Sequence, residues 1–156
     1  MLMATLYLSI GTNLGDRQSN LETALTLIGQ KIGTVKAASD NIETEPWGYD
    51  SPNRFLNMAA RVETDLEALQ ALDTAIAIEK EMGRTAKTGA DGYKDRIIDI
   101  DLLMYDDTVT DTPRLTLPHK HMHERRFVLQ PLAQIAPDLE HPLLHRTVRE
   151  LLEQTE

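Results

Sequence analysis

The amino-acid sequence predicts an α+β fold: an antiparallel sheet with helices packed on it in the β-α-β-β-α-β order of ferredoxin-like domains, followed by a C-terminal extension. Two patterns support this prediction. Four stretches are apolar in the alternating or continuous manner of strands, and two stretches between them repeat apolar residues every three or four positions, as amphipathic helices do. With 156 residues, the chain can bury roughly 70% of its unfolded surface. We therefore expect one domain over residues 1–156.

The first strand and the first helix are predicted near the N-terminus. Apolar residues alternate over residues 4–10, and the strand ends in a turn over 11–16 that contains two glycines. Either Asp16 or Ser19 can cap the helix that follows. Its apolar face is formed by Leu21, Leu25, Ile28 and Ile32.

Two further strands are predicted over residues 35–44 and 55–64. The loop between them, 45–53, is rich in Pro, Gly and Asp and is long for a hairpin. In a small domain, a loop of this length is more often a binding element than a simple connection.

The second helix is predicted over residues 65–82, because Thr64 and Glu67 have capping-box spacing and Gly83 ends the pattern. A rotation of about 100° per residue places Glu79 near the middle of an apolar arc. Either this acid has a function, or it turns out to solvent or pairs with Lys80 or Arg84. The arc comprises Leu69, Leu72, Ala75, Ile76 and Met82.

The fourth strand is predicted over residues 97–105, which are apolar on both alternations, as a central strand is. The extension after it is expected to hold extended pieces near 109–118, a short helix around 122–126, a turn at Pro131, and a last helix capped by Thr147 and Glu150.

Asp99 and Asp101 are the most informative residues of the chain. They lie two positions apart on a strand, so their carboxylates share one face, about 7 Å apart. Because burying an unpaired carboxylate is costly, we expect compensation by metal ions, by neighbouring cations, or by both. Oxygen ligands at this spacing suit Mg²⁺ bound together with substrate phosphates. The alternative is a strand end at which both carboxylates reach water or pair with Arg96.

Positive charge gathers around this strand. The net charge of −9 disfavours non-specific nucleic-acid binding. Residues 84–126 hold eight Lys/Arg against eight Asp/Glu, so the rest of the chain carries the whole net negative charge. Residues 85–95 show no apolar periodicity and contain two glycines, which predicts a mobile lid between Arg84 and Arg96. Side chains typical of a phosphate site follow the strand: Arg114, Thr116, His119, Lys120, Arg125 and Arg126.

Several classes of protein are disfavoured. The chain has no P-loop, no dinucleotide-binding glycine motif, no zinc-type His/Glu pair and no nucleophile elbow. It has no cysteine, which is compatible with a reducing cytosol, and no apolar run approaches the roughly 20 residues that span a bilayer. What remains suits phosphoryl-group transfer, in which catalysis is mainly positioning and charge neutralisation. We expect a cytoplasmic monomer that acts on small molecules, without a nucleic-acid or membrane partner.

The combined motifs resemble those of the 6-hydroxymethyl-7,8-dihydropterin pyrophosphokinases of folate biosynthesis. The resemblance covers nearly the whole chain. It is carried by residues 9–15 (Ser-Ile-Gly-Thr-Asn-Leu-Gly), 44–48 (Thr-Glu-Pro-Trp-Gly), 55–57, 79–84, 96–101 (Arg-Ile-Ile-Asp-Ile-Asp) and 118–127. It implies Mg²⁺-dependent transfer of the diphosphate of ATP to the pterin hydroxymethyl group, with release of AMP.

The resemblance also implies a role for each matching residue. Asp99 and Asp101 would bind two Mg²⁺ ions that bridge the ATP phosphates, with Asp101 also near the substrate hydroxyl. Arg84 and Arg96 would neutralise charge on the transferring group. ATP would be held further by Glu79, Arg114, Thr116, His119, Lys120 and Arg125. The pterin would lie between the rings of Phe55 and Phe127, with its edge bound by Asn57 and by the loop residues Thr44, Glu45, Pro46 and Trp47.

The chain departs from the family pattern at Ala86, where an Arg is frequent, in a longer segment over 87–95, and at Lys120, where a Tyr is common. Lys87 and Lys94 could replace the missing contacts to ATP.

Two alternatives belong to other classes. A non-catalytic, ferredoxin-like module could use the acidic strand as a metal-stabilised scaffold, and it would show no mutual enhancement of metal and nucleotide binding. An RNA-binding sheet of the same topology would carry exposed aromatic residues and a basic face, whereas this chain has two Phe, one Trp and a net charge of −9.

Overall fold

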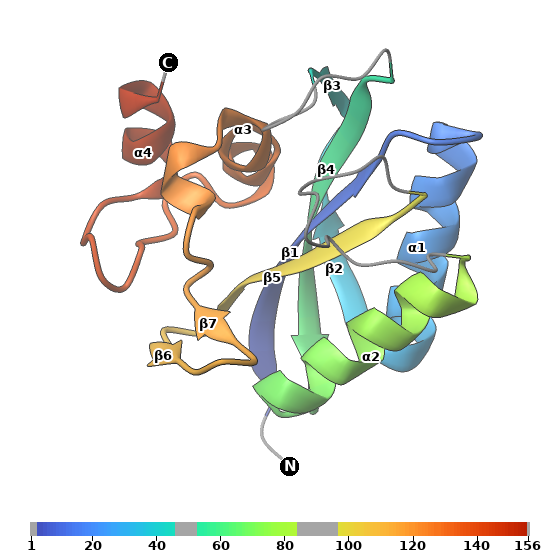
Figure 1. The fold of residues 1–156 in the computed structure, drawn as a ribbon. Helices are drawn as coiled ribbons and strands as arrows, with labels where there is room; N and C mark the ends of the chain where they lie inside the picture. Colours follow the sequence, from blue (N-terminus) through green and yellow to red (C-terminus); the bar gives the residue numbers. More distant parts are fainter. Residues whose placement is uncertain (1–2, 46–52, 84–96, 156) are drawn as a thin grey trace.

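The fold is a twisted antiparallel sheet with helices on both of its faces (Figure 1). The computed structural model describes residues 3–45, 53–83 and 97–155. Its elements are β1 (Ala4–Thr12), α1 (Arg17–Lys31), β2 (Thr34–Ala38), β3 (Ile42–Thr44), β4 (Phe55–Thr64), α2 (Ala68–Glu81), β5 (Asp99–Tyr105), β6 (Thr110–Asp111), β7 (Thr116–Leu117), the 3-10 helix η1 (Met122–Glu124), α3 (Arg126–Ile135) and α4 (Val148–Gln154).

The strand order confirms the predicted ferredoxin-like plan. The order is β2-β4-β1-β5, with every neighbouring pair antiparallel. Strand β3 lies on the same side of β4 as β2 and pairs with the other end of β4. The extension adds a separate two-stranded sheet, β6-β7, before α3 and α4.

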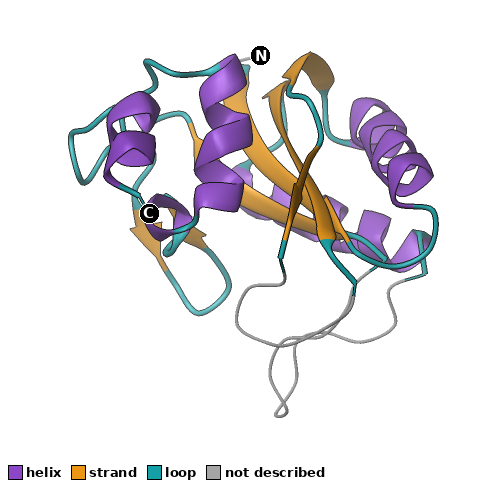
Figure 2. Ribbon diagram, turned by 90° about the horizontal axis from the view of Figure 1, so that it is seen from above, coloured by secondary structure: helices purple, strands orange, loops and turns teal. Residues whose placement is uncertain are grey.

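The two faces of the sheet carry different helices, as Figures 1 and 2 show: α1 and α2 cover one face, and α3 and α4 lie on the other. Alternate residues of each strand therefore enter two separate clusters. Leu6, Leu8 and Ile10 of β1 belong to the larger cluster under α1 and α2, whereas Tyr7 belongs to the smaller cluster around α3.

The fourth strand is an edge strand, so its predicted central position is wrong. Within the part of the chain that the structure describes, β5 pairs only with β1 in the main sheet. Its residues are apolar on both alternations because helices cover both faces, with Ile100 and Leu102 in one cluster and Leu103 in the other. Burial on two faces does not require a neighbouring strand on two sides.

The predicted strand over 35–44 is two strands, β2 and β3, separated by the polar residues 39–41. Side chains bond the backbone at this break: the Ala59 N–H donates to Ser39 Oγ at 2.8 Å, and the Asp40 N–H donates to Gln134 Oε1 of α3 at 2.8 Å. Hydrogen bonds from polar side chains thus replace part of the backbone hydrogen bonding between the strands.

The predicted start and apolar arc of the second helix need correction. Thr64 does not cap it: α2 begins at Ala68, and Glu67 and Gln70 form the capping box. The Thr64 hydroxyl instead donates to the Ile32 carbonyl at 2.6 Å. The buried face is Ala71, Ala75, Ile78 and Glu79, while Leu69 is 46% exposed. The buried face of α2 is therefore turned away from Leu69, the first residue of the predicted arc.

Pro131 lies inside α3, not in a turn. The helix continues through it because Val128, Leu129 and Leu132 are buried in the cluster on this face of the sheet, and tertiary packing outweighs the local preference for a break. The two other predicted caps are confirmed, with Asp16 capping α1 and a Thr147–Glu150 capping box on α4.

Candidate active site

The predicted site residues of three neighbouring strands meet on the face of the sheet that α3 occupies. In the register, Gly11 of β1 lies opposite Asn57 of β4 on one side and Asp99 of β5 on the other, and Ser9 lies opposite Asp101. Neighbouring strands are about 4.8 Å apart, so Asn57 and Asp99 are about 10 Å apart across the row. We call Asn57, Gly11 and Asp99, with Asp101 beside them, the site row.

Gly11 forms a floor without a side chain in the middle of the site row. A Cβ at this position would lie 2.8 Å from Asn57 Oδ1 and 3.5 Å from Cδ1 of Phe55. Any side chain would therefore displace Asn57, which is 3% exposed. The sequence places Gly11 in a turn, and only the strand register shows that it lies between Asn57 and Asp99.

Asn57 is oriented by the short strand β3. Its Nδ2 donates to Thr44 Oγ1 at 2.8 Å, and Thr44 lies opposite Phe55 in the β3-β4 pairing. The next residue, Glu45, is exposed and pairs with Arg54 at 2.7 Å. Pro46 and Trp47, also predicted to bind the pterin, lie outside the described residues.

Asp99 and Asp101 are both half-buried on the edge strand, one on each side of Ile100. No group of three or more His, Asp or Glu that could hold a metal ion occurs among residues 3–45, 53–83 and 97–155. Two carboxylates fit Mg²⁺ that takes its other oxygens from water and substrate phosphates, which is how this ion is usually bound.

Glu79 is buried, so the alternative that it turns out to solvent is wrong. Its Oε2 accepts a hydrogen bond from the Ile100 N–H at 2.8 Å, and the residue is 8% exposed. Because β5 is an edge strand, this N–H has no strand to bond on that side, and Glu79 of α2 takes the place of one. The carboxylate therefore fixes the backbone between Asp99 and Asp101.

His119 is held beside the same strand in its neutral form. The His119 N–H donates to the Leu103 carbonyl at 2.8 Å. Burial, with smaller contributions from the Arg125 charge and His121, lowers the pKa of His119 from 6.5 to about 4. Its Nδ1 accepts from the His121 N–H at 3.2 Å, so in the neutral ring the proton is assigned to Nε2, which can donate to a phosphate oxygen.

Arg125 is a buried cation at the start of α3. It is 8% exposed, and its guanidinium carbon lies 5.6 Å from the centroid of the Phe127 ring, within the range of cation–π contact. Phe127 is half-buried and packs against the cluster around α3. Phe55 is half-buried on the site face but belongs to neither hydrophobic cluster of the described residues.

The other predicted nucleotide ligands are not gathered in the same way. Arg114 pairs with Asp73 of α2, and the Thr116 hydroxyl donates to Asp111 Oδ1 at 3.1 Å. Lys120 is exposed. Arg84, Arg96 and the predicted lid at 85–95 lie outside the described residues.

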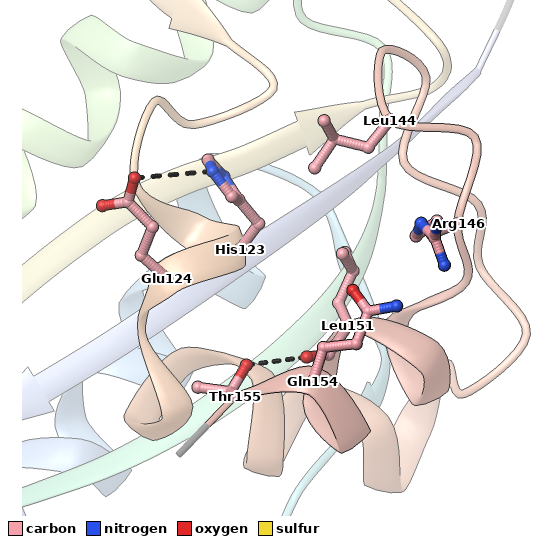
Figure 3. Close-up of a pocket in the computed structure, with 7 residues that line it drawn as sticks. All are labelled: His123, Glu124, Leu144, Arg146, Leu151, Gln154 and Thr155. Atoms are coloured by element: carbon pink, nitrogen blue, oxygen red, sulfur yellow. Dashed lines mark hydrogen bonds and ion pairs between the residues drawn. The ribbon is translucent and has the colours of Figure 1, made fainter.

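A hollow of about 540 Å³ lies between η1, the loop before α4 and the end of α4, and it contains none of the residues predicted for the site. Figure 3 shows His123 and Glu124 on one side of it and Leu144, Arg146 and Gln154 on the other. His123 Nε2 lies 3.5 Å from Glu124 Oε1. No helix among the described residues is long and apolar enough to cross a membrane.

Comparison with known proteins connects this geometry to a family. Residues 7–137 match the family model of 7,8-dihydro-6-hydroxymethylpterin-pyrophosphokinase. A 2-amino-4-hydroxy-6-hydroxymethyldihydropteridine pyrophosphokinase of Porphyromonas gingivalis is 44% identical over 90% of this chain and 95% of its own. The Bacillus subtilis protein of the same name is 38% identical over 86% of this chain and 79% of its own.

Solved structures support the fold. A crystal structure of Plasmodium falciparum HPPK-DHPS with pteroate has a TM-score of 0.81 at 17% identity, over 98% of this chain and 44% of that one. This chain thus spans less than half of that longer protein. The folic acid synthesis protein fol1 of Schizosaccharomyces pombe is longer still: it is 40% identical over 94% of this chain but only 20% of its own. The family match and the curated relatives show that this chain belongs to the 7,8-dihydro-6-hydroxymethylpterin pyrophosphokinases, enzymes of folate biosynthesis that use ATP and magnesium.

Proposed function

We propose that this member of the family transfers the diphosphate of ATP to the hydroxymethyl group of 6-hydroxymethyl-7,8-dihydropterin, giving the pterin diphosphate and AMP. The chain is a pyrophosphokinase by family. The observation that carries the assignment to this site is the site row, because it sets a hydrogen-bonding amide, an open floor and two carboxylates side by side on one face.

The acidic end of the site row is where the transfer takes place. The pterin hydroxyl oxygen attacks the β-phosphorus, the bond from this phosphorus to the oxygen shared with the α-phosphate breaks, and AMP leaves. Asp99 and Asp101 would hold two Mg²⁺ ions, which would supply charge neutralisation on the phosphates. Asp101 would lie next to the hydroxyl, whose proton is released to solvent as the new bond to phosphorus forms, and Arg84 and Arg96 would neutralise the transferring group.

ATP is held by Glu79, Arg114, Thr116, His119, Lys120 and Arg125 in addition to Arg84 and Arg96. Two properties support the assignment of His119 and Arg125. The low pKa of His119 keeps the imidazole neutral, with an Nε2 proton to donate, and Arg125 is a buried cation beside it. For Glu79 the support is its position on the backbone of Ile100, between the two aspartates.

The pterin binds at the other end of the site row. Phe55 and Phe127 provide its two aromatic walls, and Asn57 bonds its edge together with residues Thr44, Glu45, Pro46 and Trp47. The support is the orientation of Asn57 by Thr44 and the space that Gly11 leaves. Buried amides of this kind select a heterocycle by paired hydrogen bonds. We propose further that residues 1–156 act as one domain, as a monomer, and in the cytoplasm.

The test is an assay of AMP formed from ATP and hydroxymethyldihydropterin, with Mg²⁺ present or replaced by excess chelator. We expect AMP only with pterin and Mg²⁺ together. Titration of Mg²⁺ with and without a non-hydrolysable ATP analogue separates this function from a binding module, since the enzyme requires metal and nucleotide to strengthen each other's binding. Independent binding without AMP formation would refute the proposal.

A further inference from the structure

A network of ion pairs lies directly behind the pterin end of the site row. Arg17, the first residue of α1, donates from Nη1 to the Arg54 carbonyl at 3.0 Å and from Nη2 to Glu43 Oε2 at 3.1 Å. The Arg54 guanidinium in turn lies 3.7 Å from Glu43 and 2.7 Å from Glu45. We call Arg17, Glu43 and Arg54 the arginine clamp.

The arginine clamp is on the opposite side of the sheet from the proposed substrate. Leu56 and Met58 of β4 pack into the cluster under α1, so Arg54, two residues earlier, shares that side, as does Glu43 opposite Leu56. The residues that alternate with them, Thr44 and Phe55, therefore face the site. Two members of the clamp are chain neighbours of proposed pterin ligands: Glu43 precedes Thr44, and Arg54 precedes Phe55.

Strand β3 needs such support. It has three residues, and β4 is its one partner strand among the described residues. A strand this short has too few ladder bonds to fix its own position. The start of α1 binds β3 through Arg17, and it binds the residue before β3 through Gln18, whose Oε1 accepts from Asn41 Nδ2 at 2.7 Å. The Arg17 contact is the one that spans β3 and the start of β4 together.

The clamp is well placed to affect binding more than stability. It borders an open hollow of about 350 Å³ lined by Asn13, Gly15, Arg17, Glu43 and Arg54. The side chains of Arg17 and Glu43 remain 33% and 44% exposed. Exposed ion pairs contribute little to global stability, but the fork of an arginine can fix two acceptors in one geometry.

We propose that Arg17 is a positioning residue for the pterin: by joining β3 to β4 from behind, it fixes Thr44, and through Thr44 Oγ1 the amide of Asn57. This inference rests on the proposed pyrophosphokinase function. Arg17 touches neither substrate. It sets the place and orientation of the groups that do.

The experiment compares Arg17→Gln with Arg17→Lys and with Lys36→Gln. Lys36 pairs with Glu63 across β2 and β4 at 3.8 Å, with similar exposure, at the far end of the sheet. For Arg17→Gln we expect the KM for the pterin to rise about fivefold while the KM for ATP stays within about twofold, in line with the modest strength of exposed ion pairs. Melting temperature should change no more than in Lys36→Gln. Arg17→Lys should restore part of the pterin KM, because lysine can reach only one acceptor at a time.

A double-mutant cycle with Glu43→Gln gives a second measurement. We expect the effects of Arg17→Gln and Glu43→Gln on the pterin KM to be non-additive, since both remove one contact. An active wild type in which Arg17→Gln leaves the pterin KM unchanged, or raises both KM values equally, would overturn the positioning role alone. A wild type that forms no AMP would overturn the proposed function, and the clamp with it.

Discussion

The two faces of the same three strands, β1, β4 and β5, differ in the side chains that they carry. On the side of α1 and α2, Ile10, Met58 and Ile100 are buried in the larger apolar cluster. Their chain neighbours Gly11, Asn57 and Asp99 face the opposite side of the sheet. That opposite face is apolar only under α3, where Tyr7, Ala59 and Leu103 pack.

This contrast shows how a small sheet separates stability from chemistry. Apolar burial on one face stabilises the fold, so the other face can hold carboxylates and an amide without supplying the core. Because side chains alternate along a strand, a core residue and a site residue are direct chain neighbours. Substitutions at adjacent positions on β5 should therefore have opposite consequences, one for turnover and one for stability.

The largest effect is expected for Asp99→Ala and Asp101→Ala. Each should reduce turnover by at least about a hundredfold, because the carboxylates are needed to hold Mg²⁺ on the phosphates. The melting temperature without ligands should stay the same or rise, since two like charges then no longer lie close together. AMP release and thermal unfolding measure the two quantities. A variant that keeps more than a tenth of the wild-type activity would remove that aspartate from the site.

The adjacent residue should behave in the opposite way. Ile100→Ala, between the two aspartates, should lower the free energy of unfolding by about 2–5 kcal/mol, as a large-to-small change in a core does. Turnover per folded molecule should remain close to wild type, because the Ile100 backbone N–H still bonds to Glu79. Denaturant unfolding and the AMP assay check this. A loss of activity as large as in the aspartate variants would show that the two faces are coupled.

The sequence predicts the faces of the strands better than their neighbours. Alternation in β1 and the run in β4 were enough to predict the ferredoxin-like order, because side-chain periodicity reports which residues are buried. The same signal made β5 look central, since burial by helices and burial between strands leave the same pattern. Whether a strand has one neighbour or two is set by backbone hydrogen bonds, whereas the periodicity of its side chains reports only burial.

The site residues also divide into those that the sequence indicates and those that only the fold reveals. Residue type and spacing identify Asp99 and Asp101 as candidates, the family resemblance adds Asn57, and the register brings the three into one row. The importance of Gly11 as a floor depends on Phe55 and Asn57, at least 44 positions away in the chain, and that of Arg17 depends on Glu43, 26 positions away. No local pattern marks such contacts. Glu79 is intermediate: its place on an apolar face was a signal, but its partner could be found only from the fold.

Substitution of the two phenylalanines tests whether side chains on the site face also contribute to the stability of the fold. Phe127 packs against the cluster around α3, and Phe55 does not belong to a cluster. We expect Phe55→Ala to weaken pterin binding by roughly 1–3 kcal/mol, by analogy with base stacking on aromatic side chains, with little change in melting temperature. Phe127→Ala should weaken pterin binding similarly and also lower the melting temperature. Calorimetric titration with pterin and a melting curve are needed for both variants; normal pterin affinity with a large drop in melting temperature would assign the ring to the core.

The smallest effect concerns pH and shows whether the polar face also contributes to stability. His119 has a pKa of about 4 when folded, against 6.5 as its ordinary value, so the unfolded chain binds more protons between these limits. Stability from this residue is therefore fully present above pH 6.5 and is lost as the pH falls toward 4. Between pH 7 and pH 5 the loss should be about 2 kcal/mol. Urea unfolding at the two pH values, for wild type and His119→Gln, measures it. The variant should lose less stability than wild type by about this amount, because glutamine does not titrate. If both proteins lost the same amount, the pH dependence would arise elsewhere, and His119 would not be held neutral by its burial.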